Sequence, residues 1–349
     1  MNNLFICHSQ AQLTLACGLS KVRFNNDNNE LILHMDFDVK DEMRQRLRSV
    51  FNRVLYLQGV FPAENATYKA KLQYYPRGLK HAHNFLNDKY DRVFVVCDTV
   101  VLTQKIIQCV WKLNTQVEIN YLEDGIITYY RDNDMTFGLD SSKRSLLLRK
   151  IIFKYIFGVG KFYNRDFIDG GGMKCIKNAY VLFPGLVREP YKSQRNLIGI
   201  TSEEYYEGLK SLYSIKPMSI ADNAIILVVD KLDRYKYSEE VRTALATYIQ
   251  NQKAQGKTIY CKFHPREETH WEIFNSCHTL EKSIGIESIY LSLYERRNNI
   301  LIAGIKSTGL MSAKMMGYPT VSLFKLCKEK NDNLLTFYSA LNIPLVEAE

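Results

Sequence analysis

Three short polar motifs combine residue types that could act on a substrate, and each follows a run of residues typical of a β-strand. They are Glu123-Asp124-Gly125, Lys262-Phe263-His264-Pro265 and Lys306-Ser307-Thr308. A carboxylate in a partly dry site can act as a general base toward a hydroxyl. A histidine and two hydroxyl residues at helix starts can bind an anion, because helix N-termini expose N–H groups and the positive end of the dipole. Each motif also has a structural explanation, as an Asp-Gly turn, a structural histidine or a helix N-cap.

Other patterns in the sequence are set aside. Asp36-Phe37-Asp38 and Asp132-Asn133-Asp134 have the spacing of a DxD metal motif, but such acids are common in surface turns. Gly170-Gly171-Gly172 lacks the dinucleotide-binding spacing and is expected to be a flexible loop. The seven histidines show no zinc-binding spacing, and the segment 302–310 lacks the P-loop spacing. We therefore expect no metal site and no ATPase.

The elements that must position the motifs alternate between strands and helices along the whole chain, which is typical of βα units on a parallel sheet. In the first half, strands are expected at 3–7, 31–34, 54–57, 92–97 and 117–122, with helices near 10–20, 40–50, 78–88 and 100–112. In the second half, strands are expected at 224–229, 258–263, 299–303 and 320–323, with helices near 238–253, 266–275 and 307–316. The expected fold class is therefore α/β, with two Rossmann-like domains.

Proline, glycine and charged residues interrupt this pattern between the two series. The expected organisation is a first α/β domain at 1–185, a linker at 186–217 and a second α/β domain at 218–349. Two such domains facing each other leave a cleft at the carboxyl ends of their strands, where ligands bind in open α/β sheets. We expect the three motifs, each just after a strand, to face that cleft.

Composition excludes several classes of protein. With 349 residues, 46% of them hydrophobic and 24% charged, the chain is expected to fold and to be water-soluble, not disordered, collagen-like or coiled-coil. The net charge of +9 favours partners that carry phosphate, sulfate or carboxylate groups. Eight cysteines without a CxxC pair are expected to be buried free thiols. The start of the chain lacks a signal-peptide pattern and no long apolar run occurs, so we expect a cytoplasmic protein without a membrane span.

The segment 143–157 interleaves cations with large apolar residues at near-helical spacing, which predicts a basic amphipathic helix. Such a helix can dock on its own sheet with a solvated basic face. Alternatively, the basic region 143–165 can make peripheral contact with anionic lipid at the inner face of a bacterial cytoplasmic membrane. Periodicity does not separate these two interpretations.

The order and placement of the motifs resemble those of bacterial sialyltransferases with the GT-B architecture. The similarity is closest to the lipooligosaccharide sialyltransferases, glycosyltransferase family 52, with the bacterial polysialyltransferases as more distant relatives. It rests on Glu123-Asp124-Gly125, on His264-Pro265 with Arg266-Glu267, and on Ser307-Thr308. The start Cys7-His8-Ser9-Gln10-Ala11-Gln12 also resembles the family's first strand-to-loop segment, although the usual proline is absent.

The resemblance implies an inverting, metal-independent transfer of sialic acid from CMP-Neu5Ac to a terminal sugar of a bacterial surface glycan, such as lipooligosaccharide or capsule. It also implies that 1–185 is the acceptor-side domain and that 218–349 is the nucleotide-sugar-binding domain. The partners would be the CMP-sugar donor and a glycan acceptor, expected to be lipid-linked, with no nucleic acid. No cofactor and no metal ion would be required. The acceptor sugar, the linkage and the oligomeric state stay open, a homodimer included.

The resemblance also assigns catalytic roles. Glu123 would take the proton from the acceptor hydroxyl, with Asp124 as the alternative if the turn presents it instead. Asp230, at the end of the strand 224–229, is a second-domain alternative for the base. His264 would bind the CMP phosphate and protonate or hydrogen-bond the departing oxygen.

The remaining assignments concern binding. Ser307 and Thr308 would hold the CMP phosphate, and Pro265 belongs to the same donor-binding set. Glu287 lies where the family presents a carboxylate to the ribose hydroxyls. Gln12 would contact the acceptor.

Other functions stay open beside this one. A GT-B glycosyltransferase could use another CMP-nonulosonic acid, CMP-Kdo or a UDP-sugar, and hydrolysis of these donors would distinguish them. A nucleic-acid-binding protein would fit the charge of +9 and the 23 tyrosines, but the sequence shows no RNP, KH or zinc-finger pattern. A catalytically inactive GT-B scaffold is a further alternative.

Overall fold

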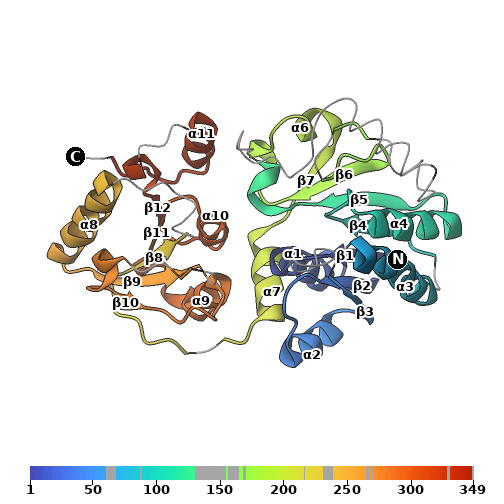
Figure 1. The fold of residues 1–349 in the computed structure, drawn as a ribbon, viewed down its shortest axis with the longest axis horizontal. Coiled ribbons are helices and arrows are strands. Elements are labelled where there is room, and N and C mark those ends of the chain that lie inside the picture. The colour runs from blue at the N-terminus through green and yellow to red at the C-terminus, as the bar shows by residue number, and fades with distance from the viewer. Residues whose placement is uncertain are drawn as a thin grey trace. The chain divides into compact units, whose positions relative to one another are not determined.

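The structure, a computed structural model, divides the chain into two compact units, Met1–Leu212 and Tyr213–Glu349 (Figure 1). It describes residues 1–59, 68–86, 89–129, 155, 165–167, 170–215, 217–230, 239–264, 267–268, 271–327 and 331–347. Each unit is a parallel α/β unit with its own core. The expected α/β fold class is confirmed.

The described part of the first unit contains a seven-stranded parallel sheet with the order β3-β2-β1-β4-β5-β6-β7. Its strands are β1 (Asn2–Cys7), β2 (Asn28–Met35), β3 (Arg53–Gln58), β4 (Arg92–Val95), β5 (Glu118–Leu122), β6 (Ile176–Val181) and β7 (Asn196–Gly199). Its helices are α1 (Gln10–Lys21), α2 (Asp41–Val50), α3 (Tyr68–Phe85), α4 (Val101–Leu113), α6 (Tyr191–Gln194) and α7 (Ser202–Leu212).

Hydrophobic runs explain the centre of this sheet. Leu4-Phe5-Ile6 in β1 and Leu31-Ile32-Leu33 in β2 are buried on both faces. Such continuous runs are typical of parallel strands covered by helices on each side. The chain proceeds from β1 outward to β3 and then returns to β4 on the other side of β1. This reversal creates a switch point at the carboxyl ends of β1 and β4, where ligands bind in folds of this kind.

The described part of the second unit contains a five-stranded parallel sheet with the order β10-β9-β8-β11-β12. Its strands are β8 (Ala224–Val229), β9 (Thr258–Phe263), β10 (His278–Thr279), β11 (Leu301–Gly304) and β12 (Thr320–Ser322). Its helices are α8 (Glu239–Ala254), α9 (Ile286–Ser292), α10 (Thr308–Met315) and α11 (Asp332–Ala340). The six residues of β8 are all buried, and the switch point lies between β8 and β11.

The close approach of α1 and α7 joins the end of the first unit to its beginning. A Cβ atom on Gly18 would lie 1.9 Å from the carbonyl oxygen of Glu204, and one on Gly208 would lie 2.0 Å from that of Thr14. Because both glycines lack a side chain, the two helix backbones are in direct contact. Arg23 reinforces the contact, since its Nε and Nη2 atoms donate to Glu204 at 2.7 and 2.8 Å.

These contacts correct the predicted domain boundary. The segment 186–212, expected to be part of a linker, contains β7 and α7 and belongs to the first unit. The prediction missed it because prolines and charged residues obscure two short elements. A second correction concerns the helix expected near 266–275, whose described part is a single 3-10 turn at Glu272–Phe274.

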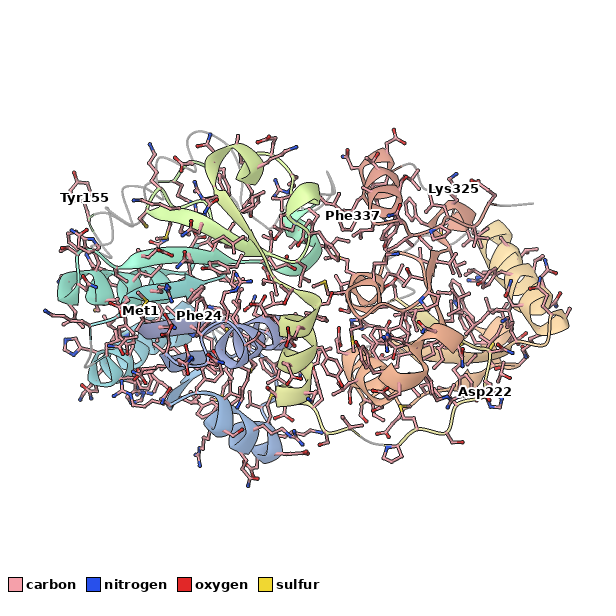
Figure 2. The ribbon with its side chains drawn as sticks, turned by 180° about the vertical axis from the view of Figure 1, so that it is seen from behind. Met1, Phe24, Tyr155, Asp222, Lys325 and Phe337 are labelled. Carbon is pink, nitrogen blue, oxygen red and sulfur yellow. The ribbon has the colours of Figure 1, made fainter. Side chains whose placement is uncertain are left out.

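The predicted basic helix lies outside the described residues, with one exception. Within 143–157 the structure describes Tyr155, which is 71% exposed (Figure 2).

On the same view, Phe24 is seen near the central strands, and its ring contacts those of Phe94 and Tyr180. Among the helices that the structure describes, none is long and apolar enough to cross a membrane.

Candidate functional site

Four neighbouring strands of the first unit each end in a titratable residue. His8 follows β1, Asp36 follows β2, Cys97 follows β4 and Asp124 follows β5. The Nδ1 atom of His8 lies 3.1 Å from Oδ2 of Asp36, so the acid set aside in the sequence as a surface turn pairs with a buried histidine. Burial raises the pKa of the Cys97 thiol, and the charges of Asp124, Asp98 and Asp36 raise it further. Acids from separate strands therefore converge around Cys97, next to the switch point.

Asp124 is held at this edge by both its backbone and its side chain. Its N–H donates to the hydroxyl of Tyr121 at 3.2 Å and to that of Thr128 at 3.4 Å. Its Oδ1 atom accepts a hydrogen bond of 2.8 Å from Nε2 of Gln12. The carboxylate is partly exposed. A partly exposed carboxylate in a fixed orientation is suited to take a proton from a bound hydroxyl.

Glu123 has a different environment from its neighbour. Its side chain is 2% exposed, and its Oε2 atom accepts hydrogen bonds from the Tyr129 hydroxyl and, at 2.7 Å, from the N–H of Leu182. Burial raises its pKa to about 8, and the adjacent charge of Asp124 adds to the shift. The side chain of Glu123 thus fastens the end of β5 to the residues that follow β6.

The triple glycine, Gly170-Gly171-Gly172, packs against Tyr121 and binds Asp98. Asp98 accepts hydrogen bonds from the N–H groups of Gly171 at 3.0 Å and Met173 at 2.9 Å. Gly171 has φ +75°, and a Cβ there would lie 2.7 Å from the ring of Tyr121. The segment expected to be a flexible loop is therefore a packed turn against Tyr121. The packing of this turn could not be predicted from the sequence, because Asp98, which binds Gly171 and Met173, lies about 70 residues earlier in the chain.

Three neighbouring strand ends carry the candidate residues of the second unit. His264 follows β9, Asp230 follows β8, and Lys306 and Ser307 follow β11. The N–H of His264 donates to the carbonyl of Val229 at 3.0 Å, and the N–H of Lys306 donates to Oδ2 of Asp230 at 3.0 Å. Asp230 thereby fixes the turn that leads from β11 into α10. Pro265 lies outside the described residues.

Ser307 and Thr308 begin α10, and Glu287 in α9 contacts the middle of the same helix. Ser307 is the N-cap, and its hydroxyl accepts the N–H of Gly309 at 3.1 Å, whereas Thr308 is exposed. Glu287 belongs to the first turn of α9, and its Oε1 atom accepts a hydrogen bond of 3.4 Å from Ser312 in α10. Burial raises the pKa of Glu287. A helix N-terminus with hydroxyl groups is suited to bind a phosphate, and a nearby carboxylate is suited to accept sugar hydroxyls.

The described residues contain no group of three or more His, Cys, Asp or Glu side chains placed to hold a metal ion. In both units the candidate residues follow the ends of strands, as the sequence predicted. Sequence reasoning did not find the partners that orient them, namely Tyr121, Tyr129 and Asp36.

A cavity of about 290 Å³ lies beside β9 and β10, lined in part by Phe263, Phe274 and Cys277. All eight cysteines are among the described residues and are free thiols; four are buried as expected, whereas the other four, Cys277 among them, are partly exposed. A hydrogen bond from Cys261 lowers the pKa of Cys277 to about 7, with the charge of Lys253 acting in the same direction. The same contact, together with burial, raises the pKa of Cys261.

We expect iodoacetamide to modify Cys277 before Cys109 at pH 7, because the thiolate is the reactive form. The rate at Cys277 should reach its plateau at a lower pH than the rate at Cys109, because the hydrogen bond from Cys261 lowers the pKa of Cys277 whereas burial raises the pKa of the partly exposed Cys109. Peptide mass spectrometry after timed alkylation measures both rates, and Cys277→Ser identifies the signal. Equal rates at the two cysteines would contradict the prediction.

Two Rossmann-like units with polar residues at their switch points are typical of the GT-B fold, and comparison with known structures agrees on the fold. The chain is similar to the glycotransferase of kitacinnamycin, with TM-score 0.55 and 9% identity over 99% of this chain and 86% of the other. It is also similar to UDP-GlcNAc 2-epimerase from Methanocaldococcus jannaschii, with TM-score 0.57 and 12% identity over 100% and 89%. A third similar structure is CalG4, the calicheamicin glycosyltransferase, with TM-score 0.50 and 12% identity over 99% and 85%.

The family is shown by sequence. The model of the alpha-2,8-polysialyltransferase family (POLYST) matches residues 3–325, so the chain belongs to this family. A search of curated protein sequences gave no match. This match confirms the expected resemblance to bacterial GT-B sialyltransferases. The family matched is the polysialyltransferases, which were expected to be the more distant relatives.

Proposed function

We propose that this glycosyltransferase moves sialic acid from CMP-Neu5Ac to a terminal sugar of a bacterial surface glycan, lipooligosaccharide or capsule. The proposed transfer inverts the anomeric centre and requires no metal ion. The observation that carries the proposal is the match to the polysialyltransferase family over residues 3–325. The polar residues at the switch points of both sheets support it.

On the acceptor side, Asp124 takes the proton from the attacking hydroxyl. Its partial exposure and the hydrogen bond from Gln12 to Oδ1 favour Asp124 over Glu123, which the sequence put first. The burial of Glu123 and its bonds to Tyr129 and Leu182 favour a structural role. Asp230 holds the turn before α10 in the second unit, which likewise favours a structural role.

On the donor side, Ser307, Thr308 and the N-terminus of α10 bind the CMP phosphate. His264 donates a hydrogen bond or a proton to the departing phosphate oxygen. Glu287 and Pro265 complete the donor site, with Glu287 accepting the ribose hydroxyls. As the bond between the anomeric carbon and the phosphate oxygen breaks, negative charge develops on CMP, and these donors stabilise it.

The atoms of this reaction balance without a further reactant. The acceptor oxygen forms a bond to the anomeric carbon, its proton passes to Asp124, and CMP leaves with the electron pair of the broken bond. Attack on the face opposite the leaving group accounts for inversion. We further propose that the acceptor is lipid-linked and that the basic region 143–165 contacts anionic lipid at the inner membrane face.

A second candidate function is the transfer of a different sugar, from a donor other than CMP-Neu5Ac. The structural similarity to an enzyme named for UDP-GlcNAc favours a UDP-sugar as the alternative to test. CMP-Kdo and other CMP-nonulosonic acids belong to the same panel.

The test is nucleotide release in EDTA from CMP-Neu5Ac, CMP-Kdo and UDP-GlcNAc, with acceptors that end in galactose or sialic acid. Acceptor-dependent CMP release from CMP-Neu5Ac is expected, and His264→Ala should reduce it about 100-fold. The matched control is His81→Ala, which changes an exposed histidine on α3 and should leave the rate unchanged. Release from UDP-GlcNAc alone, or a requirement for a divalent ion, would contradict the proposal.

A further inference from the structure

We propose that Gln12 is a positioning residue for Asp124, fixing the carboxylate from the first turn of α1, and that it does not contact the acceptor. The inference rests on the proposed function, in which Asp124 takes the acceptor proton. Gln12 is 3% exposed, which leaves little of its surface for a substrate. Its amide is instead fully engaged between the turn after β1 and the end of β5.

The backbone determines which way the amide of Gln12 faces. The N–H of His8 donates to Oε1 at 2.6 Å, and the N–H of Ser9 donates to the same atom at 3.1 Å. Two donors require an acceptor, so Oε1 must lie toward the backbone. The Nε2 group therefore points the other way, where Oδ1 of Asp124 accepts it at 2.8 Å.

The residue type at position 12 distinguishes this role from helix capping. Gln12 is the third residue of α1 and forms a capping box with Ser9. Either glutamine or glutamate can complete a capping box, because only a side-chain oxygen is needed. Only glutamine also presents an N–H group to Asp124. The hydrogen bond to Asp124 therefore requires glutamine at position 12, whereas capping of α1 does not.

This hydrogen bond matters because acidic groups surround Asp124. An N–H donor stabilises the charged form of a carboxylate, whereas neighbouring negative charges favour the protonated form. With Oδ1 held by Gln12, proton transfer is directed to Oδ2. Among the described residues, the titratable or charged groups at this corner come from the ends of β1, β2, β4 and β5, namely His8, Asp36, Cys97, Asp98, Tyr121 and Glu123, and from Arg165, whose Nη2 atom donates to Asp98 at 3.0 Å.

The decisive variant is Gln12→Glu, which keeps the capping box and replaces one N–H donor by a carboxylate oxygen. Two carboxylates would then meet and share a proton. We expect the acid limb of the pH profile of kcat/KM to move up by about one pH unit or more, which is about a tenfold loss at pH values on that limb, with an unchanged KM for the donor. The matched control is Gln116→Glu, the same change at an exposed site in the loop before β5, which should move nothing.

A second readout does not depend on activity. In protein labelled with ¹³C at the aspartate carboxyl, the resonance missing from Asp124→Asn belongs to Asp124, and its titration midpoint should move up by about one pH unit in Gln12→Glu. An unchanged midpoint in the folded variant would overturn the inference. A shifted midpoint in a protein that transfers no sugar from any donor would support the positioning role and count against the proposed function.

Discussion

Asp124→Asn is expected to lower kcat for sugar transfer by about 1,000-fold while leaving the KM for the donor within about twofold. Asparagine has nearly the shape of aspartate, and its side-chain oxygen can still accept the hydrogen bond that Gln12 gives at 2.8 Å. The variant therefore removes the proton acceptor and little else. Steady-state release of CMP from CMP-Neu5Ac at saturating acceptor measures the effect.

Glu123→Gln is the matched control for this prediction. Burial raises the pKa of Glu123 and so favours its neutral form, and glutamine has the same shape and keeps an oxygen that can accept the hydrogen bonds from Tyr129 and Leu182. The folded variant should keep activity within about threefold of the wild type. If Glu123→Gln loses activity and Asp124→Asn keeps it, the order first expected from the sequence is restored. Retention in both variants would move the base to Asp230.

Gly18→Ala is expected to lower the free energy of unfolding of the first unit by about 3 kcal/mol. In an open helix this change would stabilise, because alanine is the better helix former. Here the new methyl group would lie 1.9 Å from the backbone of Glu204 in α7, so one helix must move. The displacement would also disturb the bonds from Arg23 to Glu204.

Urea denaturation followed by circular dichroism measures this effect. The control is Gly185→Ala, since a Cβ there meets nothing within 4 Å, and its stability should stay within about 0.5 kcal/mol of the wild type. If the free energy of unfolding falls equally in both variants, the cause is the loss of glycine's backbone freedom, and the packing explanation is contradicted. A stable Gly18→Ala would show that α1 and α7 can separate at little cost.

The framework of both sheets was predictable because its central strands are continuous apolar runs. β1, β2, β8 and β9 were placed within a few residues of their observed bounds. β10 was missed because it is only two residues long, and β7 was missed because it lies in a segment interrupted by prolines and charged residues. β6 was missed because Lys177 and Asn178 interrupt its apolar pattern.

The candidate site was predictable as a set of strand ends but not as a set of roles. The sequence could not separate Glu123 from Asp124, since adjacent residues at a strand end point in opposite directions and only the tertiary structure decides which one is buried. The resemblance suggested an acceptor role for Gln12, and the sequence could not show the hydrogen bond to Asp124, which lies 112 residues later in the chain. Asp36 was dismissed for the same reason, since its bond to His8 joins two different strands.

The configuration of the sialic acid in the first transfer product tests the proposed mechanism most directly. CMP-Neu5Ac is a β-linked donor, and attack by an acceptor hydroxyl activated by Asp124 on the opposite face gives an α-linked product. NMR of the product formed by the wild-type enzyme in EDTA should show the α-glycoside, and Asp124→Asn should form none on the same timescale. A β-linked product would require two displacements, and it would contradict direct transfer to the acceptor.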